Sequence, residues 1–265
     1  MCMPTILILG CGYTGSRVAR RLLGKGASVV VTTRTPEELA DLAALGAQVR
    51  EIDVLDGPIE GFAADLVLHS IPVLHSEERT PEILAGFADP PRRIVYLSTT
   101  SVYGAQGEVD ETTAAQPRTE SERLRVAAEN AVMAGPWTSL VLRSGAIYGP
   151  GRGVHVRMRE GRYKLPGDGK NYVSRIHVED LAALAEAALF STLTGAYPVA
   201  DDEPCTSEQM ARFCAERLEL SFPESDGAPA ASRRVNGLAI RKLLGYELRY
   251  PSYRVGVAEA LEGLK

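Results

Sequence analysis

Short apolar runs alternate with amphipathic segments through the first 200 residues. Runs of strand length stand at 5–9, 28–33, 48–52, 65–69, 93–97, 139–143 and 196–200. Helical spacing lies between several of them, at 16–23, 121–133 and 179–189. The run at 28–33 lacks polar alternation, which is typical of a parallel strand buried on both faces. The pattern predicts an α/β protein with a Rossmann, doubly wound parallel sheet.

The pattern changes after Pro150 to a loop-rich, basic stretch that reaches Arg175. We therefore expect a Rossmann domain formed by 1–150 and 176–200, and a small C-terminal substrate lobe formed by 151–175 and 201–265. Capping boxes are predicted where Thr35 precedes Pro36 and Glu38, and where Thr206 precedes Gln209. A further helix at 236–244 should end at Gly245, a suitable residue for a left-handed cap.

Composition narrows the class of protein. With 45% hydrophobic and 24% charged residues, the chain can bury a large core. The apolar runs are much shorter than the ~20 residues that span a bilayer, so no membrane segment is expected. The start shows no secretory leader, which predicts a cytoplasmic location. A net charge of −5 argues against nucleic-acid binding.

Four cysteines are scattered along the chain, at Cys2, Cys11, Cys205 and Cys214. Their spacing matches neither a zinc site nor a disulfide framework, so we expect reduced thiols and no metal.

The residues from Gly10 to Gly15 form a GxGxxG motif between a predicted strand and a predicted helix. Gly10 permits a tight turn, Gly12 lets a pyrophosphate approach the backbone, and Gly15 allows close packing of helix on strand. Backbone N–H groups at Tyr13 and Thr14 and at the helix start would then face the phosphates. This context predicts a dinucleotide site.

The end of the second strand indicates which dinucleotide binds. An NAD-selective site usually carries an acidic residue there, whereas this chain has Thr33 and Arg34. A guanidinium can pair with a 2′-phosphate, which favours NADP over NAD, although Arg34 could also be an exposed loop residue. Asp53 could accept a hydrogen bond from the adenine amino group or serve only as a turn residue.

Further motifs carry a family resemblance over nearly the whole chain. They are the glycine turn, Asp53-Val54, the stretch LSTTSVYG at 97–104, YGPG at 148–151, RIHVEDL at 175–181 and YPVADDEP at 197–204. In this order they resemble the extended and atypical short-chain dehydrogenase/reductases, the NAD(P)-dependent epimerase/dehydratases. The resemblance implies additional cofactor contacts from Val54, Ser70 and Tyr148.

The resemblance also points to catalytic positions and shows a departure at one of them. It assigns to Thr99 the polarisation of the substrate oxygen. A Tyr-xxx-Lys pair, counted back from Glu129, would fall on Ser121 and Arg125, so the tyrosine is missing. Serine is a weak acid, and arginine does not exchange protons at neutral pH. Tyr103 and Tyr148 are alternative proton donors. Arg125 could still hydrogen-bond the nicotinamide ribose or a substrate anion, or Ser121 and Arg125 could lie on an exposed helix face.

A local excess of basic residues follows Pro150. Seven of them, Arg152, Arg157, Arg159, Arg162, Lys164, Lys170 and Arg175, stand against Glu160 and Asp168, and Arg233 and Arg234 could join them. The stretch predicts an anionic substrate, unless it is a solvated loop. Arg152, Arg175 and His177 are the expected substrate contacts, although His177 could also be a structural residue.

Two functions follow from these residues. The first is an NAD(P)-dependent oxidoreductase or epimerase that acts on a small anionic substrate bearing a hydroxyl or carbonyl group, sugar-nucleotide-like or smaller. The alternative is a non-catalytic NADP(H)-binding sensor or regulatory protein. The resemblance also allows a homodimer formed through the helix at 121–133.

Overall fold

The computed structural model describes residues 4–55, 60–73, 77–105 and 107–262, and these fall into two compact units. The first unit comprises Met1–Ser98, Pro117–Arg143 and Ala182–Tyr197. The second comprises Thr99–Gln116, Ser144–Leu181 and Pro198–Lys265. These units divide the chain differently from the expected domains, because 99–116, 144–150, 176–181 and 198–200 group with the C-terminal residues.

Pairing of short strands explains why the segment 99–116 belongs to the second unit. Strand β6 (Glu108–Val109) pairs in parallel with β13 (Arg234–Val235). The Arg233 guanidinium also donates to the Gly104 carbonyl. These contacts join residues more than a hundred positions apart, which the hydrophobic pattern of the sequence does not reveal.

The first unit is organised around a sheet that contains seven strands within the described part of the chain. In sheet order they are β3 (Gln48–Glu51), β2 (Ser28–Thr33), β1 (Thr5–Leu9), β4 (Leu66–His69), β5 (Arg93–Thr99), β7 (Thr138–Ser144) and β11 (Gly195–Val199). The pairs from β3 to β5 are parallel. The strand order reverses between β1 and β4. This confirms the predicted Rossmann fold, and the topological switch point lies between β1 and β4.

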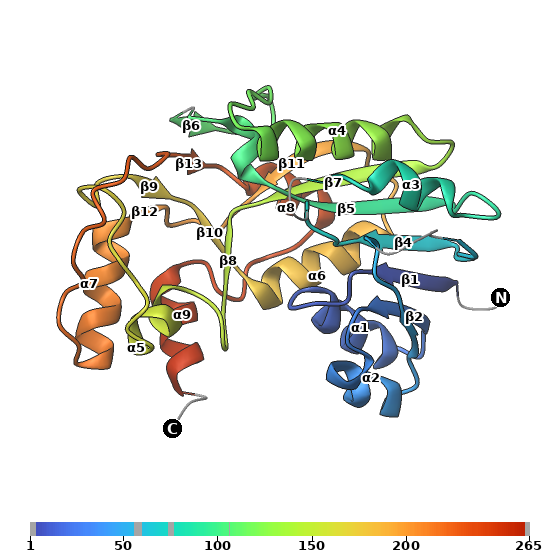
Figure 1. The fold of residues 1–265 in the computed structure, drawn as a ribbon, viewed down its shortest axis with the longest axis horizontal. Coiled ribbons are helices and arrows are strands. Elements are labelled where there is room, and N and C mark those ends of the chain that lie inside the picture. Colours follow the sequence, from blue (N-terminus) through green and yellow to red (C-terminus); the bar gives the residue numbers. More distant parts are fainter. Residues whose placement is uncertain (1–3, 56–59, 74–76, 106, 263–265) are drawn as a thin grey trace. The chain divides into compact units, whose positions relative to one another are not determined.

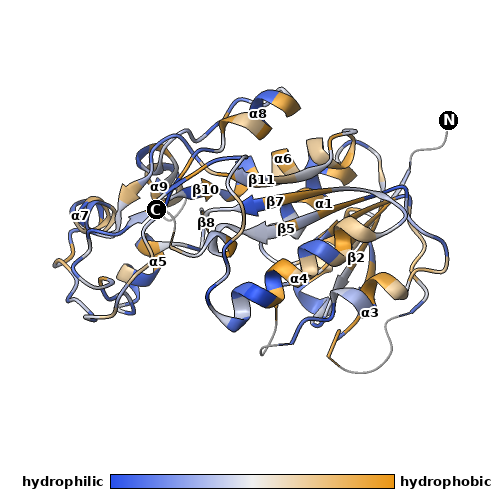
Figure 2. Ribbon diagram, turned by 90° about the horizontal axis from the view of Figure 1, so that it is seen from above, coloured by the Kyte–Doolittle hydropathy of each residue, from blue (hydrophilic) through white to orange (hydrophobic). Residues whose placement is uncertain are grey.

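Helices cover both faces of this sheet, with α3 (Thr80–Ala85) and α4 (Glu120–Ala134) on one face and α1 (Gly15–Leu23) and α6 (Val178–Leu189) on the other (Figure 1). Short helical segments, η1 (Pro36–Leu39) and α2 (Ala40–Ala44), follow β2. The buried carboxylate of Glu186 on α6 pairs with Arg21 at 2.7 Å and with Lys25 at 2.6 Å. Most of the sheet is hydrophobic away from the strand ends (Figure 2), and side chains of β1, β4, β5 and β7 contribute to the core.

One predicted capping box forms and the other is wrong. Thr206 accepts a hydrogen bond from the Gln209 amide and the Gln209 side chain returns one, as expected. Thr35 makes no side-chain cap, because its own amide donates to Thr33 Oγ1 and the next residues form the 3₁₀ turn η1. Gly245 adopts the predicted left-handed conformation, with φ of 63°.

The second unit consists of short strands and helices around its own core. Its strands, besides β6 and β13, are β8 (Ala146–Tyr148), β9 (Tyr172–Val173), β10 (Arg175–His177) and β12 (Cys205–Thr206). Its helices are η2 (Thr100–Tyr103), α5 (Val154–Arg159), α7 (Ser207–Leu218), α8 (Leu238–Leu244) and α9 (Tyr253–Glu262). Tyr148, Met210, Phe213 and Tyr253 are among the core side chains.

Helix lengths and cysteine environments in the described residues bear on two further expectations. No helix among them is long and apolar enough to cross a membrane. Cys11, Cys205 and Cys214 are buried free thiols, and Cys2 lies outside the described residues. In the same part of the chain, no group of three or more histidine, cysteine or acidic side chains is arranged to hold a metal ion.

Candidate functional site

The loop after β1 has the geometry that its first glycine predicts. Gly10 has φ of 78°, a left-handed value that favours glycine. Its amide donates to Thr32 Oγ1 at 2.9 Å, and the Cys11 amide donates to the Thr32 carbonyl at 2.7 Å. A Cβ atom on Gly10 would lie 2.8 Å from Ile71. The turn is therefore tied to β2 and tightly packed beside β4.

The other two glycines of the motif, Gly15 and Gly12, allow helix packing and leave space for a ligand, respectively. A Cβ atom on Gly15 would lie 3.1 Å from both the Ile8 side chain and the Gly10 carbonyl, so Gly15 lets α1 pack closely on β1. A Cβ atom on Gly12 would meet nothing within 4 Å. Gly12 thus borders open space at the start of α1, and a bound pyrophosphate fits this position.

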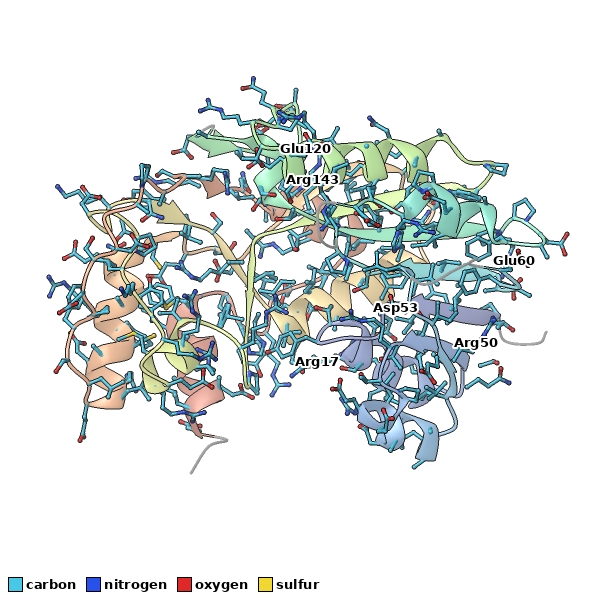
Figure 3. All side chains as sticks on the ribbon, viewed as in Figure 1. Arg17, Arg50, Asp53, Glu60, Glu120 and Arg143 are labelled. Carbon is cyan, nitrogen blue, oxygen red and sulfur yellow. The ribbon has the colours of Figure 1, made fainter. Side chains whose placement is uncertain are left out.

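The start of α1 favours negative charge. Its first turn contains no acidic residue, and Thr14 at the cap makes no side-chain hydrogen bond to the helix. The Arg17 guanidinium donates to the Tyr13 carbonyl at 2.7 Å and lies 4.1 Å from the centroid of the Tyr13 ring. Figure 3 labels Arg17 beside this helix. Sequence reasoning missed Arg17, although its spacing of four from Tyr13 could have indicated the contact.

The other predicted cofactor residues of the first unit follow β2, β3 and β4. Arg34 is exposed directly after β2 and forms no ion pair with any residue that the structure describes. Asp53 Oδ1 accepts from the Leu55 amide at 3.0 Å, as in a simple turn. Val54 is buried in the core, and the Ser70 amide donates to the Leu9 carbonyl. Val54 therefore contributes packing, while Thr33, Arg34 and Ser70 stand at strand ends, where ligands of such sheets bind.

The structure separates the environments of Ser121 and Arg125, the residues at the expected catalytic pair. Ser121 is exposed on α4. Arg125 points toward the sheet, and its Nη1 donates to the Tyr96 hydroxyl at 2.6 Å. Tyr96 is fully buried and its ring lies 4.9 Å from that of the buried His69. Sequence reasoning read β5 only as a core strand and missed this contact.

Glu129, the reference point for locating that pair, belongs to a buried ion pair. Its carboxylate accepts from Arg143 Nη2 at 2.7 Å and from Arg143 Nε at 3.1 Å. Ser98 Oγ donates to the same carboxylate at 2.5 Å. This network joins α4 to the ends of β5 and β7, which gives Glu129 a structural role.

The candidate catalytic hydroxyls of the second unit differ in exposure. Thr99 is half-buried, and its Oγ1 accepts from the Ser101 amide at 3.2 Å. Tyr103 is fully buried. Tyr148 is 3% exposed and donates to the Ser252 carbonyl at 3.2 Å. Burial, reinforced by Asp201 and Asp180, raises the pKa of Tyr148 far above its usual value. Tyr148 is consequently a poor proton donor.

Two of the three predicted substrate contacts lie in the interior of the second unit. Arg175 is 5% exposed, and its Nη1 donates to the Val173 carbonyl and to Cys205 Sγ. His177 is fully buried, with its ring 3.8 Å from that of Tyr250 and its Nδ1 accepting from the Glu179 amide. These contacts favour structural roles for both residues, the alternative that the sequence left open for His177. Arg152 is exposed beside the Gly149 turn.

Much of the predicted basic cluster is already paired. Arg162 contacts Glu160, Lys170 lies 3.7 Å from Asp168, and Arg234 lies 3.2 Å from Glu108. Arg157 lies 5.4 Å from the Tyr163 ring centroid. The positive field of this stretch is therefore weaker than the count of basic residues indicates.

Comparisons with known proteins agree with this geometry. A sequence model of the NAD dependent epimerase/dehydratase family matches residues 6–196. A 3-diazoavenalumate denitrifying reductase from a Streptomyces species is 31% identical over an alignment that covers 49% of each chain. That relative is thus matched over only about half of its length.

Solved structures are similar over nearly the whole chain. A conserved protein of unknown function from Silicibacter pomeroyi is 32% identical, with a TM-score of 0.79 and coverage of 99% of this chain and 100% of that one. The UDP-glucuronic acid 4-epimerase from Bacillus cereus, solved in complex with NAD, is 18% identical, with a TM-score of 0.82 and coverage of 98% and 100%. At that identity, the second likeness shows a shared fold.

Proposed function

Because the chain belongs to the NAD dependent epimerase/dehydratase family, we propose that it is an NAD(P)-dependent oxidoreductase or epimerase. Its substrate would be a small anionic molecule with a hydroxyl or carbonyl group. The observation that carries this proposal is the open space beside Gly12 at the uncapped start of α1. A position where a Cβ atom would meet no neighbour, at a helix start without acidic residues, is suited to binding a phosphate.

The residues of the first unit fit a dinucleotide. The loop from Gly10 to Gly15 would hold the pyrophosphate, and the nicotinamide ring supplies hydride transfer when it is bound. We propose NADP(H) as the preferred form, with NAD(H) as the alternative. This preference is supported by Arg34, whose exposed guanidinium follows β2 without an ion-pair partner in the described residues.

The chain's own residues limit the proton chemistry. Thr99 is the half-buried hydroxyl that would orient the reacting oxygen. Tyr103 and Tyr148 are both buried, and Ser121 is a weak acid on the helix surface. We therefore propose that the proton comes from water or from the substrate itself rather than from a tyrosine of this chain.

The same features support a second candidate, a non-catalytic NADP(H)-binding sensor. The glycine loop is intact, whereas both candidate tyrosines, Tyr103 and Tyr148, are buried. This combination is expected of a protein that binds its cofactor but no longer catalyses a reaction. Thr99 favours the enzyme, because a sensor does not require a hydroxyl that orients a substrate.

One set of measurements separates the two functions. Calorimetry gives the affinity for NADP(H), and nicotinamide absorbance reports turnover over a panel of sugar phosphates, nucleotide sugars and hydroxy acids. For an enzyme, Thr99→Val should lower turnover, whereas the exposed control Thr112→Val should not. Tight NADP(H) binding without turnover of any substrate would support the sensor. Turnover that Thr99→Val leaves unchanged would refute the role of Thr99.

Location and assembly are proposals of the same kind. We propose a cytoplasmic protein without nucleic-acid or membrane partners, in line with its composition. We also propose a homodimer through α4. An apolar groove of about 460 Å³ supports it, lined by residues of α3, α4 and the loops that follow them, among them Leu84, Phe87, Ala131 and Trp137. Ala131→Arg should then yield a monomer by light scattering, whereas the exposed helix variant Asn130→Arg should remain a dimer.

A further inference from the structure

Arg125 is held in place by two buried aromatic side chains of the sheet. Its Nη1 lies 2.6 Å from the Tyr96 hydroxyl, and Tyr96 and His69 face each other from the paired strands β5 and β4. His69 Nε2 in turn lies 2.9 Å from Thr80 Oγ1 on α3. Both aromatic residues are at most 1% exposed. The orientation of the guanidinium is therefore determined by a packed and rigid support.

This support provides no negative charge. Burial raises the pKa of Tyr96 to about 12, against the lowering effect of Arg125, so the phenol is neutral. Burial, with a smaller contribution from Arg125, lowers the pKa of His69 to about 3, so the imidazole is neutral as well. The positive charge of Arg125 is thus not balanced by the groups that orient it.

The nearby carboxylates are engaged elsewhere. Glu129, one helical turn beyond Arg125, accepts from Arg143 and Ser98. Glu78 accepts from the Thr80 amide at 2.7 Å. Within the described part of the chain, Arg125 forms no ion pair, and its only hydrogen bond leads to Tyr96. A half-buried guanidinium without a direct ion-pair partner in the described residues favours a bound anion.

The position of Arg125 places this charge where a ligand of the sheet would lie. Helix α4 begins at Glu120 and runs opposite to the strands (Figure 1), so Arg125, in its second turn, is near the edge where the strands end. The supporting strands β4 and β5 adjoin β1, where the strand order reverses. Ligands of open α/β sheets bind outside the carboxyl ends of the strands at this reversal.

We propose that Arg125 binds the anionic group of the substrate, a carboxylate or a phosphate, and that Tyr96 is the residue that positions it. Nε and Nη2 of Arg125 remain available for a bidentate contact, because Tyr96 accepts only from Nη1. The inference rests on the proposed function and specifies which residue recognises the anion. It concerns the substrate rather than the dinucleotide.

The test measures binding of two probe anions, inorganic phosphate and malonate, by calorimetry with and without saturating NADP(H). Arg125→Gln should abolish binding of whichever probe the native protein takes, and Tyr96→Phe should weaken it about tenfold, as expected for a lost hydrogen bond to a charged group. The matched control is Arg123→Gln, which removes an exposed arginine of the same helix that pairs with Glu120. This control should bind the anion as the native protein does.

The pH dependence of binding distinguishes charge recognition from a structural role. Native affinity for malonate, whose carboxylates are ionised throughout, should stay constant from pH 7 to pH 10, whereas Arg125→Lys should lose affinity for malonate toward pH 10 as the lysine, with a usual pKa of ~10.4, deprotonates. Preference for one probe identifies the substrate anion as a phosphate or a carboxylate.

Two results would overturn the inference. One is that neither anion binds the native protein in either cofactor state. The other is that Arg125→Gln weakens NADP(H) binding and leaves anion binding unchanged, which would assign Arg125 to the cofactor. Failure of the proposed function would give another result. Native protein would then bind an anion through Arg125 but would not bind NADP(H), and this would contradict only the dinucleotide assignment.

Discussion

Replacement of Glu129 by alanine tests the buried network that connects α4 to the sheet. The Glu129 side chain is 1% exposed and that of its partner Arg143, labelled in Figure 3, is 10% exposed. The carboxylate accepts a bifurcated hydrogen bond from Arg143 Nε, one from Arg143 Nη2 and one from Ser98 Oγ. Without it, the Arg143 guanidinium would lose, in the interior, the carboxylate with which it forms this ion pair.

The cost follows from the burial of both partners. Removal of one partner from a buried ion pair costs about 3–5 kcal/mol, because the remaining charge is not compensated. The free energy of unfolding of a typical domain is roughly 5–15 kcal/mol, so this loss is a large share of the total. The pair formed by Arg123 and Glu120 on the same helix has side chains that are 55% and 65% exposed. For Glu120→Ala we expect a loss below about 1 kcal/mol.

Urea unfolding followed by tryptophan fluorescence measures both losses. A double variant, Glu129→Leu with Arg143→Met, supplies a further check, because removal of both charges leaves no uncompensated ion. We expect this variant to be more stable than Glu129→Ala. The reasoning would be refuted if Glu129→Ala lost less than about 1 kcal/mol, or if the double variant were no more stable than Glu129→Ala.

Three further predictions concern the cofactor and the pH dependence of stability. Arg34→Ala should remove most of the preference for NADP(H) over NAD(H) in calorimetry, and equal native affinities for the two would contradict this. Gly12→Val should fold normally, since its side chain enters open space, yet lose the thermal stabilisation that NADP(H) gives to native protein. Burial raises the pKa of Asp201 from 3.8 to about 8, so the folded state binds the proton more tightly than the unfolded state. Native stability should therefore fall as pH rises from 4 to 8, and the melting temperature of Asp201→Asn should change less over that range.

The glycine motif could be predicted in detail because its requirements are local. Each glycine was assigned a role from its place between a strand and a helix, and the left-handed turn at Gly10 and the close packing at Gly15 follow those assignments. The parallel order of the strands followed from the alternation of strands and helices. Such features depend on a few consecutive residues, and these are what a single sequence displays.

Helix caps show how neighbouring groups compete with a local signal. Thr35 has the expected spacing to Glu38. Its amide donates to the Thr33 hydroxyl instead, and a 3₁₀ turn replaces the first helical turn. Thr119 caps α4 through a reciprocal bond with Glu122, which sequence reasoning did not identify. A capping pattern thus indicates which hydrogen bonds can form, and competition with neighbouring groups determines which of them do form.

Contacts between distant residues could not be derived from the pattern. Arg125 and Tyr96 are separated by 29 positions. The sequence placed Arg125 at the expected catalytic pair or on an exposed helix face, and it offered no link to Tyr96. Arg234 and Glu108 are separated by 126 positions, so a count of basic residues overstated the charge of that stretch. A count along the chain omits partners that only the fold brings together.

The positions of the hydroxyl groups decide how this chain can handle a proton. General acid catalysis by a positioned side chain is worth about 10²–10⁴ in rate, and it requires a group whose pKa is near the working pH. Tyr148 is far from that condition because burial raises its pKa, and Tyr103 is fully enclosed. Arg125 keeps its charge at every physiological pH, so it can attract an anion but cannot relay a proton. If the proposed function holds, a reaction on this scaffold would depend on electrostatic placement of the substrate, with Thr99 as the proposed orienting hydroxyl, more than on an acid supplied by the protein.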